Sequence, residues 1–325
     1  MIRMHDGISI VVPVYNSEES LSPLVERLER VLPALAREYE VILVNDGSRD
    51  RSWEVAAHLA RAHGRVRSIN LVRNFGQHNA LLAGIRAARF GIVVTMDDDL
   101  QHPPEEIGKL LERLDRGADV VYGTPGRLQH GFWRNFFSRF TKVALARAMR
   151  IDTIVDFNAF RAFRTNLREA FRSYESPHLL LDVLLSWGTS RFAAVEVEHK
   201  PRAYGRSNYT PVKLFNQAML MLTGFSTAPL RFASSLGFFF TLFGFGVLIY
   251  VVTRYLILGG SVPGFPFLAS LIAILSGAQL FALGIIGEYL ARIFNRSMQR
   301  PVYVVKEFVS GSDTTAGSIP ADDRS

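Results

Sequence analysis

Short apolar runs alternate with segments of helical spacing along the first two hundred residues. Residues 7–15 and 39–45, and the later runs VRSINLV, GIVVTM and ADVVYG, are rich in β-branched residues and predict strands. Between them, SPLVERLERVL, DRSWEVAAHLARAH, GQHNALLAGIRAA and PPEEIGKLLERL predict helices, with Ser22 as N-cap and Pro23 as first residue of the first one. Strands this apolar, separated by helices, predict an α/β domain whose mostly parallel sheet is covered on both faces.

The pattern changes after Arg231, where long apolar runs are almost free of charge. Residues 232–252 and 267–286 are each long enough to cross a bilayer, which takes about 20 apolar residues. The short turn GGSVPGFP joins them, so a transmembrane hairpin is expected; a hairpin buried in a soluble core is the alternative. We therefore expect a domain over residues 1–230, the hairpin over 231–294 and a tail over 295–325 that is disordered after 310.

Flanking charge orients this hairpin. The positive-inside rule places basic flanks in the cytoplasm. Both termini and the N-terminal domain are therefore expected on the cytoplasmic side of a plasma (inner) membrane, in a multi-pass protein. The basic residues before the first span and after the second are Arg202, Arg206, Lys213, Arg231, Arg292, Arg296 and Arg300.

Residues 131–150, GFWRNFFSRFTKVALARAMR, interleave cations with aromatic residues at helical spacing. This pattern predicts an amphipathic helix in the membrane interface, with its aromatic side chains in lipid and its cations near lipid phosphates. A helix that packs on the protein core and leaves a solvated basic face is the alternative.

The charge balance points to an anionic partner. The 325 residues include 37 Lys and Arg against 30 Asp and Glu, a formal net charge of +7. Such a balance suits nucleic acid, a phospholipid surface or a phosphorylated substrate. Beside two predicted spans, we expect membrane lipid and a phosphorylated substrate, and no nucleic acid. The chain has no cysteine, which excludes disulfides and thiolate metal sites.

Unusual residues gather where the predicted strands end, which is where ligands bind in such sheets. In VTMDDDLQHPPEE, Asp97 and Asp99 would project to one side of an extended segment and Asp98 to the other. These two carboxylates, with the amide oxygen of Gln101, suit Mg²⁺ or Mn²⁺ carrying a diphosphate. A solvated acidic turn before a helix is the alternative.

Two other stretches carry candidate ligand contacts. Asp46 in VNDGSRD precedes Gly47, which permits a tight turn, and could accept hydrogen bonds from a nucleobase or ribose; an ordinary Asp-Gly turn is the alternative. In HKPRAYGRSNYT, Arg202 and Arg206 with Ser207 could close over a phosphate. That cluster could equally bind anionic lipid headgroups.

The motifs PVYN, VNDGSRD, RNFGQHNALLAG, DDDLQHPPEEI, VDFNAFRAFR, GRSNYT and GEYLARIF…RPVYVV, with the hairpin, resemble those of family 2 glycosyltransferases that load polyprenyl phosphate. That group includes dolichol-phosphate mannose synthases and undecaprenyl-phosphate glucosyl and formamidoarabinose transferases. The resemblance covers Ile8 to Val305. It implies a GT-A, Rossmann-like nucleotide-sugar domain with interfacial helices and a two-helix anchor. It also implies inverting transfer from a nucleotide-sugar donor, expected to be UDP-linked, to a polyprenyl phosphate, and a homo-oligomer, often a tetramer.

The resemblance assigns roles to individual residues. A nucleoside pocket, a metal and diphosphate site, phosphate contacts and an acceptor-side acid are implied, with Asp99, Arg202 and Asp156 as the catalytic set. The nucleoside pocket would contain Pro13, Tyr15, Asn16 and Asp46. The metal and diphosphate site would contain Asp97, Asp99 and Gln101, with Asp98 beside them. The phosphate contacts would come from Arg202, Arg206 and Ser207, and the acceptor-side acid would be Asp156.

Three departures from the family pattern stand out. Ser17 follows Asn16 where the family usually has glutamate, with Glu18 and Glu19 after it. Asp98 stands where alanine is common, an extra charge that we expect only to be solvated. Asn208 replaces a frequent lysine, which moves the expected phosphate contact toward Arg202 and Arg206.

The acceptor chemistry limits what the protein must do. A phosphate monoester is mostly dianionic at neutral pH and is already a nucleophile. The harder tasks are to bring two anions together and to stabilise the leaving diphosphate. Asp156 is therefore expected to position the acceptor or the sugar rather than to take a proton, and a role as base is the alternative. Glucose is the first expectation for the sugar and 4-deoxy-4-formamido-arabinose the alternative.

Two rival functions remain. A processive polysaccharide synthase would carry a Gln-x-x-Arg-Trp motif and more spans, but Trp53, Trp133 and Trp187 are not preceded by arginine. A catalytically silent membrane scaffold is the rival from another class, and the intact acidic and phosphate-binding motifs argue against it.

Overall fold

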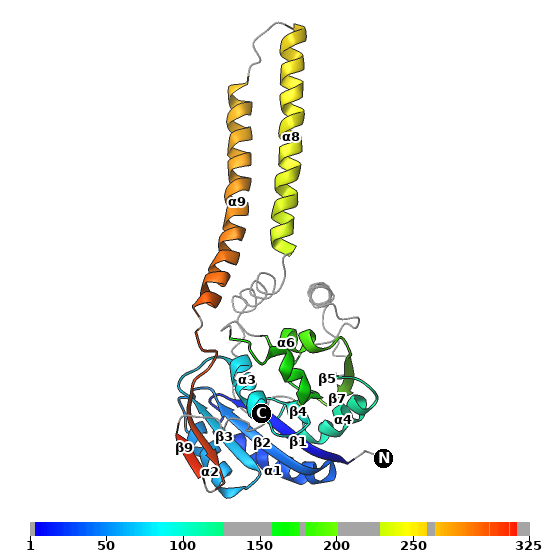
Figure 1. The fold of residues 1–325 in the computed structure, drawn as a ribbon, viewed down its shortest axis with the longest axis vertical. Coiled ribbons are helices and arrows are strands. Elements are labelled where there is room, and N and C mark those ends of the chain that lie inside the picture. Colours follow the sequence, from blue (N-terminus) through cyan, green and yellow to red (C-terminus); the bar gives the residue numbers. More distant parts are fainter. Residues whose placement is uncertain are drawn as a thin grey trace. The chain divides into compact units, whose positions relative to one another are not determined.

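The computed structural model describes residues 4–125, 158–175, 180–200, 228–258, 264–298, 300–311 and 313–316. The chain divides into two compact units, residues 1–207 together with 300–325, and residues 208–299. In this division residues 300–325 belong to the N-terminal unit, whereas the sequence led us to expect a separate tail. Figure 1 shows the elements of both units.

The centre of the sheet is parallel, as the apolar strands predict. β1 (His5–Val14) lies between β2 (Ala36–Asn45) and β4 (Ile92–Thr95), and β3 (Val66–Leu71) pairs with β2 in parallel. β1 and β2 are apolar over most of their length and almost wholly buried. Their carboxyl ends meet at one edge of the sheet, where the candidate site residues follow.

The sheet as a whole is mixed, so the expectation of a mostly parallel sheet is corrected. Its order is β7-β5-β6-β4-β1-β2-β3-β8-β9. β5 (Val120–Pro125) and β7 (Phe192–Val197) pair in parallel, whereas β6 (Arg161–Arg164) runs antiparallel to β4 and β5. A strand as short as β6, carrying arginine at both ends, has no apolar run by which to recognise it.

Helices cover both faces of the sheet. Ile10 and Val12 of β1 share one core cluster with leucines of α1 (Leu21–Val31) and α4 (Ile107–Asp115), and with α2 (Ser52–Ala62). On the other face α3 (Gln77–Ala87) packs closely, since a Cβ on Gly84 would lie 2.3 Å from Val11 Cγ1. The remaining helical elements of this unit are η1 (Leu32–Ala34), η2 (Pro104–Glu106), η3 (Thr165–Phe171) and α6 (Leu181–Gly188).

Two helix starts differ in detail from the sequence prediction. α1 begins at Leu21 after Ser20, so Ser22 lies inside the helix instead of capping it. After the acidic turn, Pro104 opens the short 3₁₀ helix η2, which contains Glu105 and Glu106, and α4 follows from Ile107. The proline at the start and the acidic residues in the first turn are both favourable at a helix N-terminus.

The described tail is ordered as strands, which corrects the expectation of disorder directly after residue 310. β8 (Val305–Ser310) pairs antiparallel with β3, and β9 (Asp313–Ala316) pairs with β8. Phe308 and Val309 are buried, and the Phe308 ring lies 5.0 Å from the Arg67 guanidinium. An uncovered β3 would leave a row of unpaired backbone groups, and the tail removes that exposed edge.

The second unit contains two long apolar helices, α8 (Ala228–Leu258) and α9 (Phe265–Ser297), which contact one another. Each includes a stretch long and apolar enough to cross a membrane, Leu230–Ile257 and Ile274–Ala291. Both helices extend beyond the spans expected from the sequence. The predicted interfacial helix at residues 131–150 lies outside the described residues.

Candidate functional site

The loops after β1 and β2 are joined through Asn16. Its backbone has φ of +52°, a left-handed conformation that asparagine tolerates better than most residues. The Asn16 N–H donates to Ser48 Oγ at 3.0 Å, and the Asn16 side-chain oxygen accepts the Arg49 N–H at 2.8 Å. Asn16 therefore has a structural function in this edge of the sheet, and its expected contact with the nucleoside stays a prediction.

Pro13 and Tyr15 lie at the end of β1. Pro13 is buried and pairs with Val44 of β2, while pairing with β4 ends at Val11 and Thr95. The missing proline N–H therefore falls where the ladder to β4 has already ended. Tyr15 is 39% exposed, so its ring suits the predicted contact with a nucleoside.

Asp46 organises the loop that follows β3. It is 3% exposed, and its two carboxylate oxygens accept the N–H groups of Phe75 at 2.7 Å and Gly76 at 2.9 Å. Burial raises the pKa of Asp46, and the two backbone N–H groups partly offset that rise. Both oxygens already bind protein, so a nucleobase or ribose would have to share them.

Gly47 allows the loops after β2 and β3 to pack backbone against backbone. Its φ is +63°, and a Cβ there would lie 2.5 Å from the Arg73 carbonyl carbon and the Asn74 nitrogen. Both the dihedral angle and the close approach require glycine. The VNDGSRD motif is thus a tight turn against which the loop after β3 packs.

The acidic residues occupy a turn rather than a continuation of β4, which ends at Thr95. Asp97 Oδ1 accepts the Gln77 side-chain amide at 2.6 Å. Asp99 is 8% exposed, and its Oδ1 accepts the Gln101 N–H at 3.1 Å. The Gln101 carbonyl in turn accepts the Lys200 N–H at 2.9 Å. Gln101 thus contributes backbone groups to the turn, and its expected side-chain contact with a metal stays a prediction.

Asp98 does not face away into solvent, so that expectation is wrong. It is half-buried, and its Oδ2 accepts the Tyr15 N–H at 3.4 Å. Burial raises the pKa of Asp98 to about 6; the Ser17 hydroxyl and the Tyr15 N–H favour its ionised form, and the Asp99 charge opposes it. Strict alternation of side chains holds only for extended backbone, and the turn redirects Asp98 toward the end of β1.

The donor set fits a hard divalent cation. Mg²⁺ and Mn²⁺ are commonly held by one or two carboxylates together with substrate phosphates and water. Asp97 and Asp99 offer two such carboxylates. Within the described ranges, no three His, Cys, Asp or Glu side chains converge as a complete ligand group. The residues therefore suit an ion that takes its other ligands from a diphosphate and water.

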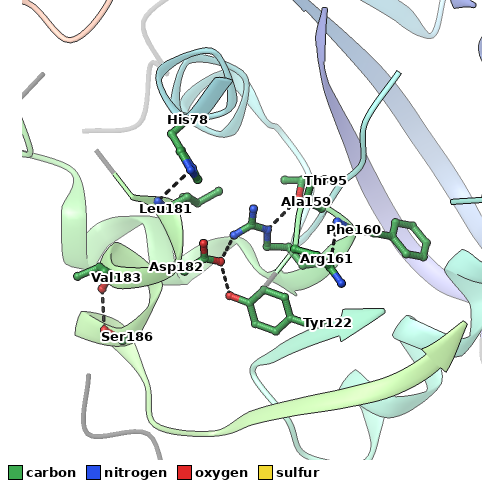
Figure 2. Close-up of polar contacts among 11 residues, drawn as sticks. His78, Thr95, Tyr122, Ala159, Phe160, Arg161, Leu181, Asp182, Val183 and Ser186 are labelled. Carbon is green, nitrogen blue, oxygen red and sulfur yellow. Dashed lines mark hydrogen bonds and ion pairs between the residues drawn. The ribbon is translucent and has the colours of Figure 1, made fainter. Parts of the chain in front are cut away.

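A buried cation lies close to this acidic turn. Arg161 of β6 is 2% exposed and forms an ion pair with Asp182 of α6, while its Nε donates to Thr95 Oγ1 at 3.2 Å. The Tyr122 hydroxyl donates to the same Asp182 at 2.6 Å. Figure 2 shows Arg161 between Thr95 and Asp182, with Tyr122 beside them.

The positive charge of Arg161 interacts with the acidic turn that follows β4. Burial disfavours the Arg161 charge, but attraction to Asp182, then Tyr122 and Asp97, raises its pKa above the ordinary value. Like-charged carboxylates at one strand end need such a cation nearby. Arg161 therefore offsets part of the negative charge of the acidic turn before any metal binds.

His102, which the sequence leaves without a role, is 9% exposed. Burial lowers the pKa of His102 to about 4, with the neighbouring His199 adding to the effect and Asp99 opposing it. The ring is therefore neutral at neutral pH. Its contacts are aromatic, with Phe160 and His199.

Four predicted site residues lie outside the described part of the chain: Asp156, Arg202, Arg206 and Ser207. Their assigned roles stay predictions. The segment that leads toward the last three is described as far as Lys200, which contacts Gln101.

Sequence reasoning missed Gln77, Arg161 and Asp182. Gln77 and Arg161 lie inside the motifs RNFGQHN and VDFNAFRAFR, but their partners come from other elements. Asp182 did leave a signal, since it is a lone carboxylate in the apolar run LLLDVLL. Such a charge is rarely buried unless a cation pairs with it.

The mixed sheet, its carboxyl-end loops and the acidic turn are those of a GT-A glycosyltransferase. The chain belongs to glycosyl transferase family 2, whose model matches residues 9–175. The predicted enzyme class and GT-A fold are therefore confirmed.

Two relatives are similar over almost their whole length. The undecaprenyl-phosphate 4-deoxy-4-formamido-L-arabinose transferase of Pseudomonas aeruginosa (strain LESB58) is 34% identical over 317 residues, which cover 96% of this chain and 93% of that protein. The protein of the same name from Proteus mirabilis is 37% identical over 309 residues, covering 93% of this chain and 94% of that protein.

A solved structure with the same fold is more distant in sequence. Glucosyl-3-phosphoglycerate synthase from Mycobacterium tuberculosis, in complex with Mn²⁺ and UDP-glucose, superposes with a TM-score of 0.50 at 18% identity. The match covers 67% of this chain and 77% of that one. At this identity the likeness concerns the fold alone.

Proposed function

We propose that this protein transfers 4-deoxy-4-formamido-L-arabinose from a nucleotide donor, UDP-linked in our proposal, to undecaprenyl phosphate at the cytoplasmic face of the membrane. The observation that carries the proposal is similarity to transferases of that name at 34% and 37% identity over more than nine-tenths of the chain. Glucose was the first expectation from the sequence. These relatives favour the formamidoarabinose alternative instead.

The donor would bind at the carboxyl edge of the sheet. Tyr15 offers an exposed ring to the nucleoside, and the loop held by Asp46 and Gly47 closes the same edge. Asp97 and Asp99 would hold a Mg²⁺ or Mn²⁺ ion beside the diphosphate. That ion, when bound, supplies positive charge that stabilises the leaving diphosphate.

Neighbouring residues of the protein orient the carboxylates of Asp97 and Asp99 and offset their negative charge. Gln77 fixes one oxygen of Asp97, and the Gln101 N–H fixes one oxygen of Asp99. Arg161 lowers the cost of holding these carboxylates ionised, because its buried charge lies near Asp97. Fixed dipoles and charges of this kind need no rearrangement as negative charge develops on the leaving group.

The acceptor side of the proposal rests on residues beyond the described ones. An anionic phosphate monoester is itself the nucleophile, so transfer needs positioning more than proton removal. Arg202, Arg206 and Ser207 would contact phosphates, and Asp156 would position acceptor or sugar. The apolar helices α8 and α9 would anchor the enzyme where the lipid phosphate leaves the bilayer. We also propose a homo-oligomer, a tetramer as in related enzymes, in the inner membrane.

The test uses membranes that contain the full-length protein, undecaprenyl phosphate and the UDP-linked formamidoarabinose donor labelled in the sugar. Label should enter the organic-extractable lipid, stop on addition of EDTA and return with Mn²⁺ or Mg²⁺. Asp99→Asn should lower transfer at least about a hundredfold, as expected for a lost transition-state contact to the metal. Unchanged transfer in EDTA would contradict the metal assignment, and no lipid product from any donor would contradict the function.

A further inference from the structure

His102 connects three separate segments of the N-terminal unit. Its ring stacks on Phe160, with ring centroids 5.1 Å apart and planes inclined by 22°. The His199 ring meets it edge-on at 5.0 Å and 63°. Phe160 directly precedes β6, and His199 follows β7. His102 thus lies between the acidic turn and the ends of two other strands.

The turn that His102 closes is strained. Leu100 has φ of +59° and is 8% exposed. The left-handed conformation is unfavourable for leucine and persists only where surrounding contacts impose it. Hydrogen bonds hold the turn on both sides of Leu100, since the Gln101 N–H donates to Asp99 Oδ1 at 3.1 Å and the Gln101 carbonyl accepts the Lys200 N–H at 2.9 Å.

The described contacts of His102 use the flat face and edge of its ring. Its Nδ1 is buried and has no hydrogen-bond partner among the described residues. Leaving a buried nitrogen unpaired is unfavourable. A second hydrogen bond joins the segment after the acidic turn to the segment after β7, because the Glu198 N–H donates to the Glu106 carboxylate at 2.9 Å. The contact between the His102 and His199 rings therefore lies between two hydrogen bonds, one to Gln101 in the turn and one to Glu106 in η2, that join residues 101–106 to residues 198–200.

We propose that His102 is a positioning residue whose ring holds the strained turn, so that Asp97 and Asp99 present their carboxylates to a metal-bound diphosphate. This role rests on the proposed function as far as the ligand is concerned. The contacts that support it, with Phe160, His199 and the residue 198–200 segment, involve no metal. Aromatic pairs contribute enough beyond buried area to change an affinity by up to about tenfold.

The experiment measures Mn²⁺ binding to the full-length protein in detergent with excess UDP, from the electron paramagnetic resonance signal of free Mn²⁺. His102→Phe keeps a flat ring without nitrogens, whereas His102→Asn keeps polarity without a ring. The His102→Phe variant should bind Mn²⁺ within about twofold of the unmodified protein. The His102→Asn and His102→Ala variants should bind it about tenfold more weakly. His58→Ala, at an exposed histidine of α2, is the matched control and should leave binding unchanged.

Hydrogen–deuterium exchange of residues 96–103 without ligand supplies the second readout. Exchange should accelerate in the Ala and Asn variants and stay unchanged in Phe. If His102→Ala does not fold, His199→Ala removes only the exposed edge partner and should accelerate exchange in the same peptide.

Two results would overturn the role of His102. In one, the His102→Phe variant binds Mn²⁺ as weakly and exchanges as fast as the His102→Ala variant, which would assign the role to the ring nitrogens. In the other, no variant changes either readout. Absence of Mn²⁺–UDP binding by the unmodified protein would instead count against the proposed function, and the exchange measurement would still decide whether His102 holds the turn.

Discussion

The backbone N–H of Tyr15 donates to Asp98 Oδ2 at 3.4 Å, which joins the end of β1 to the acidic turn after β4. The Ser17 hydroxyl favours the ionised form of the same carboxylate. Ser17 and Asp98 are the two places where this sequence departs from the Asn-Glu and Asp-Ala-Asp patterns of the enzymes it resembles. The two departures lie side by side, and we infer that Asp98 supplies the carboxylate that the first loop lacks.

This compensation predicts a rescue. Asp98→Ala should raise the KM for the nucleotide-sugar about tenfold, the size expected when a hydrogen-bonded charge is lost. Adding Ser17→Glu to that variant should restore most of the affinity, because the carboxylate returns from the other loop. Ser17→Glu alone should impair binding, since two carboxylates would then compete for one place. A double variant no better than Asp98→Ala would show that the two positions are independent.

Asp98 also predicts a pH dependence of stability. Its pKa in the folded protein, about 6, lies above the ordinary value of 3.8. The folded state therefore binds this proton more tightly than the unfolded state. The stability that the proton contributes is present below about pH 4 and is lost as pH rises through about 6. Melting temperatures in metal-free detergent solution should fall less over this range for Asp98→Asn than for the unmodified protein. Parallel pH profiles would contradict the burial of Asp98.

Gly47 offers a test of the loop packing. Gly47→Ala must place a Cβ 2.5 Å from backbone atoms of residues 73 and 74 at a φ of +63°. Strain of this kind costs about 1–3 kcal/mol, and the displaced loop should also weaken UDP binding. Gly64→Ala is the control, because nothing lies within 4 Å of its Cβ position. Thermal melting and UDP titration of both variants check the prediction, and equal behaviour of the two would contradict it.

Arg161 should be indispensable for stability. Arg161→Met leaves Asp182, whose side chain is only 14% exposed, without its cation, which costs about 3–5 kcal/mol. Arg161→Met combined with Asp182→Leu should recover part of that loss, because the uncompensated charge is gone. Arg116→Met breaks an exposed pair with Glu112 on α4 and should change stability little. The comparison is made by thermal or denaturant unfolding, and a single variant as stable as the Arg116 control would refute the buried-pair account.

The sequence predicted most of the framework around the site. The apolar runs located β1 to β5, and the shared strand ends correctly brought Tyr15, Asp46 and the acidic turn to one edge of the sheet. It could not predict β6, whose four residues show no apolar run, or the pairing of the tail with β3, which depends on contacts far apart in the chain. Asp98 was misjudged for a local reason, because the alternation of an extended strand was applied to a turn.

The most direct test of the proposed function is a competition between donors. Membranes containing the protein receive equal concentrations of the UDP-linked 4-deoxy-4-formamido-L-arabinose donor and UDP-glucose with undecaprenyl phosphate, and the lipid products are weighed by mass spectrometry. We predict that undecaprenyl phosphate carrying formamidoarabinose dominates, and that Asp99→Asn removes this product. A product carrying only glucose, or no sugar-linked undecaprenyl phosphate at all, would contradict the proposed function.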